Sequence, residues 1–236
     1  SDGHPHYVGA PGMNQVGKFL ADGLDIRSNC TVGGIERRGA DWLLSDHANA
    51  KLGRFDGVVL ALPPAQAAVL ADDHPDLVAL CATRDMLPCF ALMIGLSGPL
   101  ELPWDAALVR GADISWISVN SSKPDRIGAP ALVAHSTNAW AAAHVEDDLD
   151  EVREHLLAQV SLVTGVEMQD ARHCDLQRWR FANIASRAGP AFYFDEQRCF
   201  GACGDWFVRG RVEAAFTSGA DLAESIVAGF DAPRRA

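Results

Sequence analysis

The residues with the clearest chemical potential are a glycine–aspartate pair, Gly204 and Asp205, near the C-terminal end. They follow a short apolar stretch that ends at Cys203, and a helix rich in small residues is predicted over 211–230. A carboxylate at the end of a strand can accept hydrogen bonds from sugar hydroxyls. The free N–H groups of 211–214 can face a diphosphate, with the helix dipole behind them. This spacing predicts a site for a ribityl or ribose diphosphate.

Strands and turns elsewhere in the chain must position this pair. The apolar run 55–62 is typical of a strand that is buried on both faces. It stops at Pro63 and Pro64, which can start a helix that runs through Ala71. Residues 29–37 alternate around Val32 and predict another strand.

The middle of the chain is rich in predicted strands. The alternating and apolar segments that predict them are 89–96, 106–109, 115–121, 131–136 and 174–184. One long helix is predicted over 138–165, and its acidic run 146–151 is interpreted as a solvated helix face. The chain is therefore predicted to have a mixed α/β (α+β) fold in which a nucleotide-binding domain is discontinuous in sequence.

Composition limits the classes of partner and the compartment. A net charge of −11 argues against nucleic acid and anionic membranes as partners. No apolar run approaches the roughly 20 residues needed to span a bilayer. The six cysteines form no C-x-x-C pair, so a metal site is a poor fit. Free thiols in a reducing cytoplasm are expected instead.

Several blocks, in order, resemble one family over nearly all of the chain. The chain resembles the renalase-like branch of the flavin-containing amine oxidase superfamily. The blocks that carry the resemblance are 8–13, 55–63, 116–124, 134–140, 177–182 and 203–219. The segments 121–124 and 178–182 point to the renalase-like branch, although Asp125 replaces the glycine that is usual before Arg126.

The resemblance implies an incomplete FAD-binding Rossmann-like domain, made of 1–64 and 191–236. It also implies an antiparallel-sheet substrate domain over 65–190. The residues that it assigns to FAD are Gly204, Asp205, Trp206, Arg211, Val212, Glu213 and Val32. An ordinary turn aspartate at 205, a surface helix end at 212 and plain sheet core at 32 are the alternatives.

One departure from the family changes what is expected of this chain. The family begins with a strand, a turn and a helix that carry G-x-G-x-x-G and bind the ADP half of FAD, and residues 9–12 lack that spacing. We therefore expect a fragment, or a protein that has lost this module. FAD binding is expected to be weak or absent unless another polypeptide supplies the segment.

Flavin enzymes transfer hydride at the flavin, so protein side chains mainly position the substrate. The candidates for that role are His135, Trp179 and Arg178. The alternative for His135 is an ordinary core or surface histidine, and the alternative for Trp179 is core packing. Four cations could contact substrate phosphates: Lys123, Arg126, Arg178 and Arg180. For Lys123 a solvated loop lysine is the alternative.

The resemblance implies an FAD-dependent oxidoreductase that oxidises a reduced nicotinamide-type substrate and passes the electrons to O2. This activity is expected only where the G-x-G-x-x-G segment is present. A flavin amine oxidase is the first alternative, because the enclosing superfamily oxidises amines; an amine substrate would favour an aromatic cage with few cations. A flavin-less binding or structural module is the second alternative.

Overall fold

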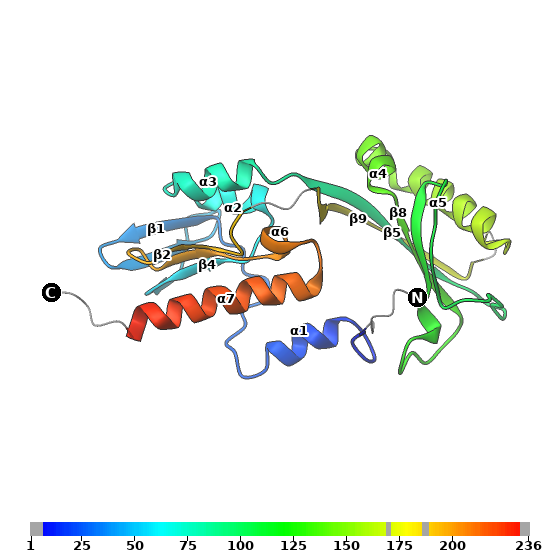
Figure 1. Cartoon of the computed structure of the whole chain (residues 1–236), viewed down its shortest axis with the longest axis horizontal. Coiled ribbons are helices and arrows are strands. Elements are labelled where there is room, and N and C mark those ends of the chain that lie inside the picture. Colours follow the sequence, from blue (N-terminus) through cyan, green and yellow to red (C-terminus); the bar gives the residue numbers. More distant parts are fainter. Residues whose placement is uncertain (1–6, 169–170, 186–188, 232–236) are drawn as a thin grey trace. The chain divides into compact units, whose positions relative to one another are not determined.

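The chain divides into two compact units, each assembled from two separate stretches of sequence (Figure 1). The structure is a computed structural model, and it describes residues 7–168, 171–185 and 189–231. Unit 1 comprises 1–26 and 88–180, and unit 2 comprises 27–87 and 181–236.

Unit 1 is built on a five-stranded sheet in the order β6-β7-β8-β5-β9. Its strands are β5 (Met86–Gly95), β6 (Ala106–Leu108), β7 (Ile114–Val119), β8 (Ala131–Ser136) and β9 (His173–Ile184). The pairs β6–β7, β7–β8 and β8–β5 are antiparallel, which confirms the predicted sheet type. Its helices are α1 (Asn14–Leu20), the single turn η1 (Asn120–Ser122), α4 (Asn138–His144) and α5 (Leu149–Thr164).

Helices α4 and α5 cover one face of this sheet, and the hydrophobic core of unit 1 lies between them and the strands. Alternate residues of β5 and β8 point into that core, together with one side of α5. They are Phe90, Leu92, Ile94, Leu132, Ala134, Val152, Leu156 and Val160. The intervening residues, such as Met93 and His135, therefore lie on the opposite face.

The predicted helix over 138–165 is two helices, and this prediction was wrong in one respect. Asp148 caps α5, because its side chain accepts hydrogen bonds from the N–H groups of Asp150 and Glu151. A capping residue has non-helical backbone, so the acidic run contains a helix start and is not one continuous helix face. Glu146 and Asp147 lie in the connection between α4 and α5 and are exposed.

Within its described residues, unit 2 contains two three-stranded sheets and four helices. One sheet is an antiparallel meander of β1 (Gly34–Arg38), β2 (Asp41–Ser45) and β3 (Lys51–Phe55). The other has the order β10-β11-β4 and consists of β10 (Tyr193–Asp195), β11 (Phe200–Ala202) and β4 (Val58–Leu60). The helices are α2 (Pro64–Leu70), α3 (Pro75–Ala82), α6 (Asp205–Val208) and α7 (Val212–Asp231).

The sheet of β10, β11 and β4 packs on both of its faces. Phe200 and Ala202 enter a core that also contains Leu77 of α3. Gly201, between them, faces α7, and a Cβ added there would lie 3.1 Å from two methyl groups of Leu222. Because Gly201 has no side chain, helix α7 packs directly against β11.

Two predicted strands of unit 2 are shorter than expected. The run predicted as one strand over 55–62 contains the last residue of β3, Phe55, and then β4; Val59 of β4 is 45% exposed, so burial of this strand on both faces was wrong. Its strand lies at the edge of the sheet and pairs only with β11 among the described residues. The strand predicted over 29–37 begins at Gly34, and Asn29 has a left-handed φ of 55°, which interrupts an extended chain.

The predicted domains and the two units divide the chain differently. Residues 65–87 were assigned to the substrate domain, yet α2 and α3 pack onto β4 and β11 in unit 2. Residues 1–26 group with the five-stranded sheet. The functional assignment of the domains stays a prediction.

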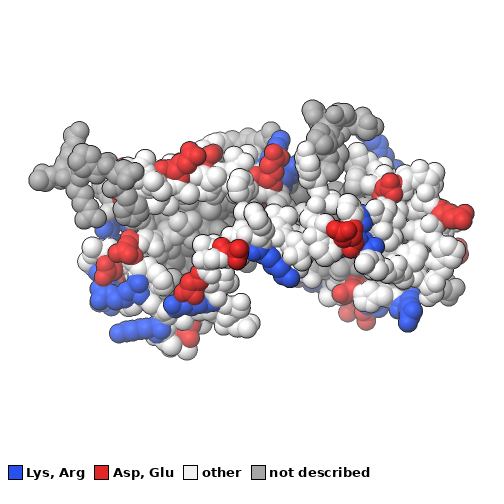
Figure 2. All heavy atoms as spheres, turned by 90° about the horizontal axis from the view of Figure 1, so that it is seen from below, with Lys and Arg blue, Asp and Glu red and all other residues white. Residues whose placement is uncertain are grey.

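The surface carries both signs of charge. On the face drawn in Figure 2, acidic and basic side chains are interspersed. Over the described part of the chain, no helix is both long enough and apolar enough to cross a membrane.

Candidate functional site

The turn at Gly204 and Asp205 follows β11 directly and is tied to α7 by a buried serine. The N–H of Gly204 donates to Oγ of Ser218 at 3.0 Å, and this hydroxyl donates to the carbonyl of Ala191 at 2.6 Å. Ser218 is 0% exposed. The helix therefore fixes the position of the turn. Sequence reasoning missed Ser218, although it lies four residues after the buried Ala214 on the inner face of α7.

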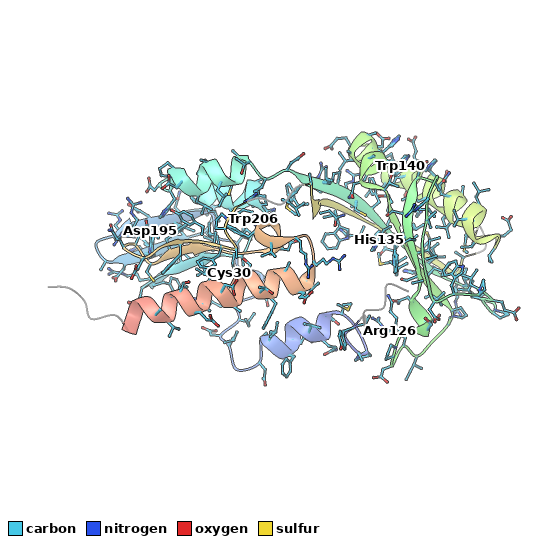
Figure 3. The ribbon with its side chains drawn as sticks, in the orientation of Figure 1. Cys30, Arg126, His135, Trp140, Asp195 and Trp206 are labelled. Atoms are coloured by element: carbon cyan, nitrogen blue, oxygen red, sulfur yellow. The ribbon has the colours of Figure 1, made fainter. Side chains whose placement is uncertain are left out.

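Glycine is required at 204 because Trp206 lies directly against it. A Cβ at this position would lie 2.8 Å from Nε1 and 2.9 Å from Cδ1 of the Trp206 indole. Trp206, labelled in Figure 3, is 2% exposed. Its Nε1 donates to the carbonyl of Leu62 at 2.9 Å. The side chain of Trp206, predicted to contact the cofactor, is thus part of the core that supports the turn.

Asp205 is the first residue of α6, and its carboxyl group is partly buried. Burial raises the pKa of this carboxyl, while the N–H groups of Trp206 and Asp205 itself favour the ionised form and oppose that rise. No lysine or arginine among the described residues forms an ion pair with it. The carboxylate therefore has acceptor capacity left for a hydroxyl group.

The start of α7 offers main-chain donors. The carbonyl of Arg211 accepts from Ala215 at 3.1 Å, so the first helical N–H groups, 212–214, have no partner within the helix. The Glu213 carboxylate receives a hydrogen bond from Arg209 at 3.0 Å, and Val212 is 64% exposed. The helix contributes peptide N–H groups and its dipole, whereas the side chain of Glu213 is already paired.

Val32 lies in the same unit as this turn, two residues before β1. The N–H of Gly33 donates to Ser45 at 2.8 Å, which attaches the segment to the end of β2. The structure thus brings the predicted cofactor residues into one unit. It provides a fitting environment for the ribityl and diphosphate half of FAD, because the close glycine turn, the carboxylate and the helix start are all present.

In unit 1, His135 lies on the sheet face opposite α4 and α5 (Figure 3). Its neighbours across the sheet are Ala91 and Trp116. Burial, and then the charge of Lys123, lower the pKa of His135. The imidazole is therefore neutral at neutral pH, because both effects disfavour its cation.

Trp179 lies on β9 and its side chain is 53% exposed, so it is not a core residue. Cys174 and Leu176 of this strand pack against the core on the helix-covered face. Alternation then directs Trp179 to the face that carries His135.

The guanidinium groups of Arg178 and Arg180 are directed to the helix side of the sheet. Arg178 donates from Nη2 to the carbonyl of Asp147 at 2.8 Å and lies 5.9 Å from the ring centre of Phe90. Arg180 pairs with the carboxylate of Glu146, with Nη2 and Oε2 3.0 Å apart. Both arginines hold the α4–α5 connection against β9. Trp179 lies on the opposite face of the sheet.

Comparisons with known proteins identify the fold. A family model described as flavin containing amine oxidoreductase matches residues 2–226. A protein from Exiguobacterium sp. 255-15, assigned as a protoporphyrinogen oxidase, is similar with a TM-score of 0.72 and 15% identity over 91% of this chain and 51% of that chain.

Two further solved structures are similar over comparable lengths. Wild-type putrescine oxidase bound to putrescine has a TM-score of 0.67 and 16% identity over 92% of this chain and 53% of that chain. Cyclohexylamine oxidase from Brevibacterium oxydans IH-35A has a TM-score of 0.64 and 15% identity over 93% of this chain and 53% of that chain. The chain therefore spans about half the length of these structures.

Proposed function

Because the chain belongs to the flavin containing amine oxidoreductase family, we propose that it holds the ribityl and diphosphate part of FAD in an enzyme that oxidises a small molecule. The observation that carries this proposal is the turn at Gly204 and Asp205. It presents a carboxylate with free acceptor capacity, and Ser218 fixes it to the helix that supplies the N–H groups.

Each part of the turn has a distinct role. The Asp205 carboxylate accepts hydrogen bonds from ribityl hydroxyls, and the N–H groups of 212–214 face the diphosphate. FAD, when bound, supplies the acceptor for a hydride from the substrate. In unit 1, the neutral His135 and the exposed Trp179 are the residues we propose for positioning the substrate.

For the substrate we propose a reduced nicotinamide-type molecule, with O2 as the electron acceptor, as the renalase-like blocks imply. Lys123 and Arg126 support the nicotinamide-type substrate. Among the residues that the structure describes, neither cation forms an ion pair with a carboxylate, so both can bind a substrate phosphate. An amine substrate is the alternative. Trp179 favours it, since an exposed indole can bind an ammonium group, and two of the similar structures are named as amine oxidases.

We also propose that the protein works in the cytoplasm. Its six cysteines are free thiols, and burial raises the pKa of the Cys81, Cys89 and Cys203 thiols, which keeps them protonated and unreactive. Such thiols are compatible with a reducing compartment.

Titration of the purified chain with FAD tests the cofactor assignment, with quenching of flavin fluorescence and the visible absorbance bands as readouts. Asp205→Asn should weaken binding about tenfold, since it replaces a charged acceptor of hydroxyl hydrogen bonds. Asp72→Asn, on the exposed turn after α2 of the same unit, is the matched control and should leave affinity unchanged.

Two results would reject the proposal. If FAD produces no quenching and no bands even when the G-x-G-x-x-G segment is supplied as a separate polypeptide, this chain is the flavin-less module. If the two variants bind FAD equally well, Asp205 is an ordinary turn residue. A second titration, with a strand-turn-helix segment carrying G-x-G-x-x-G added as a separate polypeptide, shows whether affinity depends on that segment. Stopped-flow reduction by dihydronicotinamide mononucleotide or by an amine then separates the two substrate classes.

A further inference from the structure

Unit 1 contains a pocket of about 340 Å³ on the connection between β7 and β8. Asn120, Ser121, Arg126 and Ala131 line it, and Pro11 joins the lining from the segment before α1. All of these residues belong to unit 1. Figure 3 shows Arg126 on this connection, beside the segment that leads into α1.

Arg126 is half-buried at this pocket, and its side chain has no hydrogen-bond partner among the described residues. Its Nε is inaccessible to solvent and has no hydrogen-bond acceptor. Its Nη1 lies at the Gly12 end, 3.9 Å from where a Cβ on that glycine would be. Within the described ranges, Arg126 forms no ion pair. A buried charged donor without an acceptor is costly, so such groups are normally satisfied by a ligand or an ion.

A second cation lies close by. Lys123 is partly buried, and its Nζ donates to Oδ1 of Asn120 at 3.1 Å. Burial, and then the charge of Arg126, lower the pKa of Lys123. Asp125 also lines the pocket, but the structure pairs its carboxylate with neither cation among the described residues. The two positive charges therefore repel each other with no carboxylate bound between them.

Neutral donors and small residues complete the pocket. The Ser121 hydroxyl oxygen accepts from the N–H of Ala131 at 3.2 Å, which leaves its proton free to donate. Gly128 and Ala129 contribute little side-chain volume to the lining. The pocket thus combines a guanidinium fork, a hydroxyl donor and a nearby ammonium, which is the donor set for a tetrahedral oxyanion.

We propose that this pocket binds a phosphate group, held by Arg126 and Ser121, with the charge of Lys123 behind them. Its volume exceeds that of a single phosphate ion, so it can hold a phosphate that belongs to a larger molecule. The identification of that molecule as the phosphorylated part of a nicotinamide substrate rests on the proposed function. The phosphate pocket itself requires no flavin.

Calorimetric titration of the full chain with inorganic phosphate tests this inference. Arg126→Gln should weaken phosphate binding about tenfold, and Ser121→Ala by a smaller factor. The reason is that hydrogen bonds from a charged donor contribute more binding free energy than those from a neutral hydroxyl. Arg110→Gln is the matched control: it removes one exposed positive charge from the β6–β7 connection of the same unit. Its affinity should equal that of the parent. Far-ultraviolet circular dichroism checks folding, and Arg126→Lys, which keeps the charge but loses the fork, should also weaken binding.

Three results would overturn the phosphate pocket: no phosphate binding, equal weakening in Arg126→Gln and Arg110→Gln, or parental affinity in both Arg126→Gln and Arg126→Lys. Equal weakening would mean non-specific attraction to positive charge.

The source of the phosphate is decided by two further ligands, nicotinamide mononucleotide and nicotinamide riboside. Tighter binding of the mononucleotide than of phosphate, with no binding of the riboside, supports a substrate phosphate. Equal binding of mononucleotide and phosphate supports the pocket with free phosphate as its ligand. Because Arg126→Gln should leave the FAD titration unchanged, failure of the pocket and failure of the flavin proposal are separate outcomes.

Discussion

Replacing Gly204 by alanine tests whether the turn depends on close contact with Trp206. The new Cβ would lie 2.8 Å from Nε1 of the indole. The indole has little room to retreat, because it stacks on Phe207 at 3.8 Å and donates to Leu62 at 2.9 Å. Overpacking of a core costs about 1–3 kcal/mol. Weakening this hydrogen bond costs about 0.5–1.5 kcal/mol more.

We therefore expect Gly204→Ala to lower the free energy of unfolding by about 2–4 kcal/mol. With a typical urea dependence, the unfolding midpoint falls by about 1 M or more. Urea titration followed by tryptophan fluorescence measures the shift. Gly219→Ala is the matched control, because its Cβ would meet only Sγ of Cys203, at the ordinary distance of 3.9 Å. In the interior of α7 this change should stabilise by about 1 kcal/mol.

The two substitutions add the same methyl group to the same unit and should have opposite signs. An unchanged or raised midpoint in Gly204→Ala would refute the role of Trp206 in fixing the turn.

Three further predictions concern buried polar groups. Asp205→Asn should stabilise the chain at neutral pH. Burial raises the pKa of the carboxyl, so the protonated form favours the fold, and this contribution is lost as pH rises through the folded pKa. The gain should disappear below about pH 3.9, where the carboxyl is protonated in both states, and urea midpoints at the two pH values measure it. His74 is 3% exposed and stacks on Phe200 at 3.8 Å, and burial lowers its pKa, so its stabilising contribution is present above about pH 6.5 and is lost as pH falls through the folded pKa. His74→Phe should remove this acid sensitivity, and an unchanged pH profile of thermal unfolding would contradict it. Ser136→Ala should cost about 1–3 kcal/mol, because the buried N–H of Phe90 loses its acceptor at 2.9 Å; equal urea midpoints for variant and parent would argue against that loss.

The local pattern of the sequence was enough to predict most elements. Strand β8 has the predicted bounds 131–136, because its alternation is regular and a turn precedes it. Helix α2 starts at Pro64, as the proline pair predicted. The break before α5 was missed, since an aspartate within an acidic run looks the same whether it caps a helix or lies in its middle. The side-chain hydrogen bonds of Asp148 decide between the two.

The candidate site was only partly predictable, because several of its contacts join distant residues. The glycine–aspartate turn was visible from local spacing. Ser218, which fixes it, reaches Ala191 across 27 residues. The partner of Arg180 is Glu146, 34 residues away, so no local pattern could assign that arginine to the helix side of the sheet.

The parallel pairing of β4 with β11 affects how the chain can fold. It brings Val58 beside Phe200, and the indole of Trp206 donates to Leu62 across 144 residues of sequence. In the sequence, residues 88–180 of unit 1 separate the two segments that form unit 2, 27–87 and 181–236. Pairings of such long range are slow to form, because the loop they close is long. During synthesis, β4 is made before its partner β11, and residues 88–180 are made between them. Until β11 is made, the edge of β4 that pairs with it is exposed, and we expect the first half of unit 2 to be prone to aggregation over that interval.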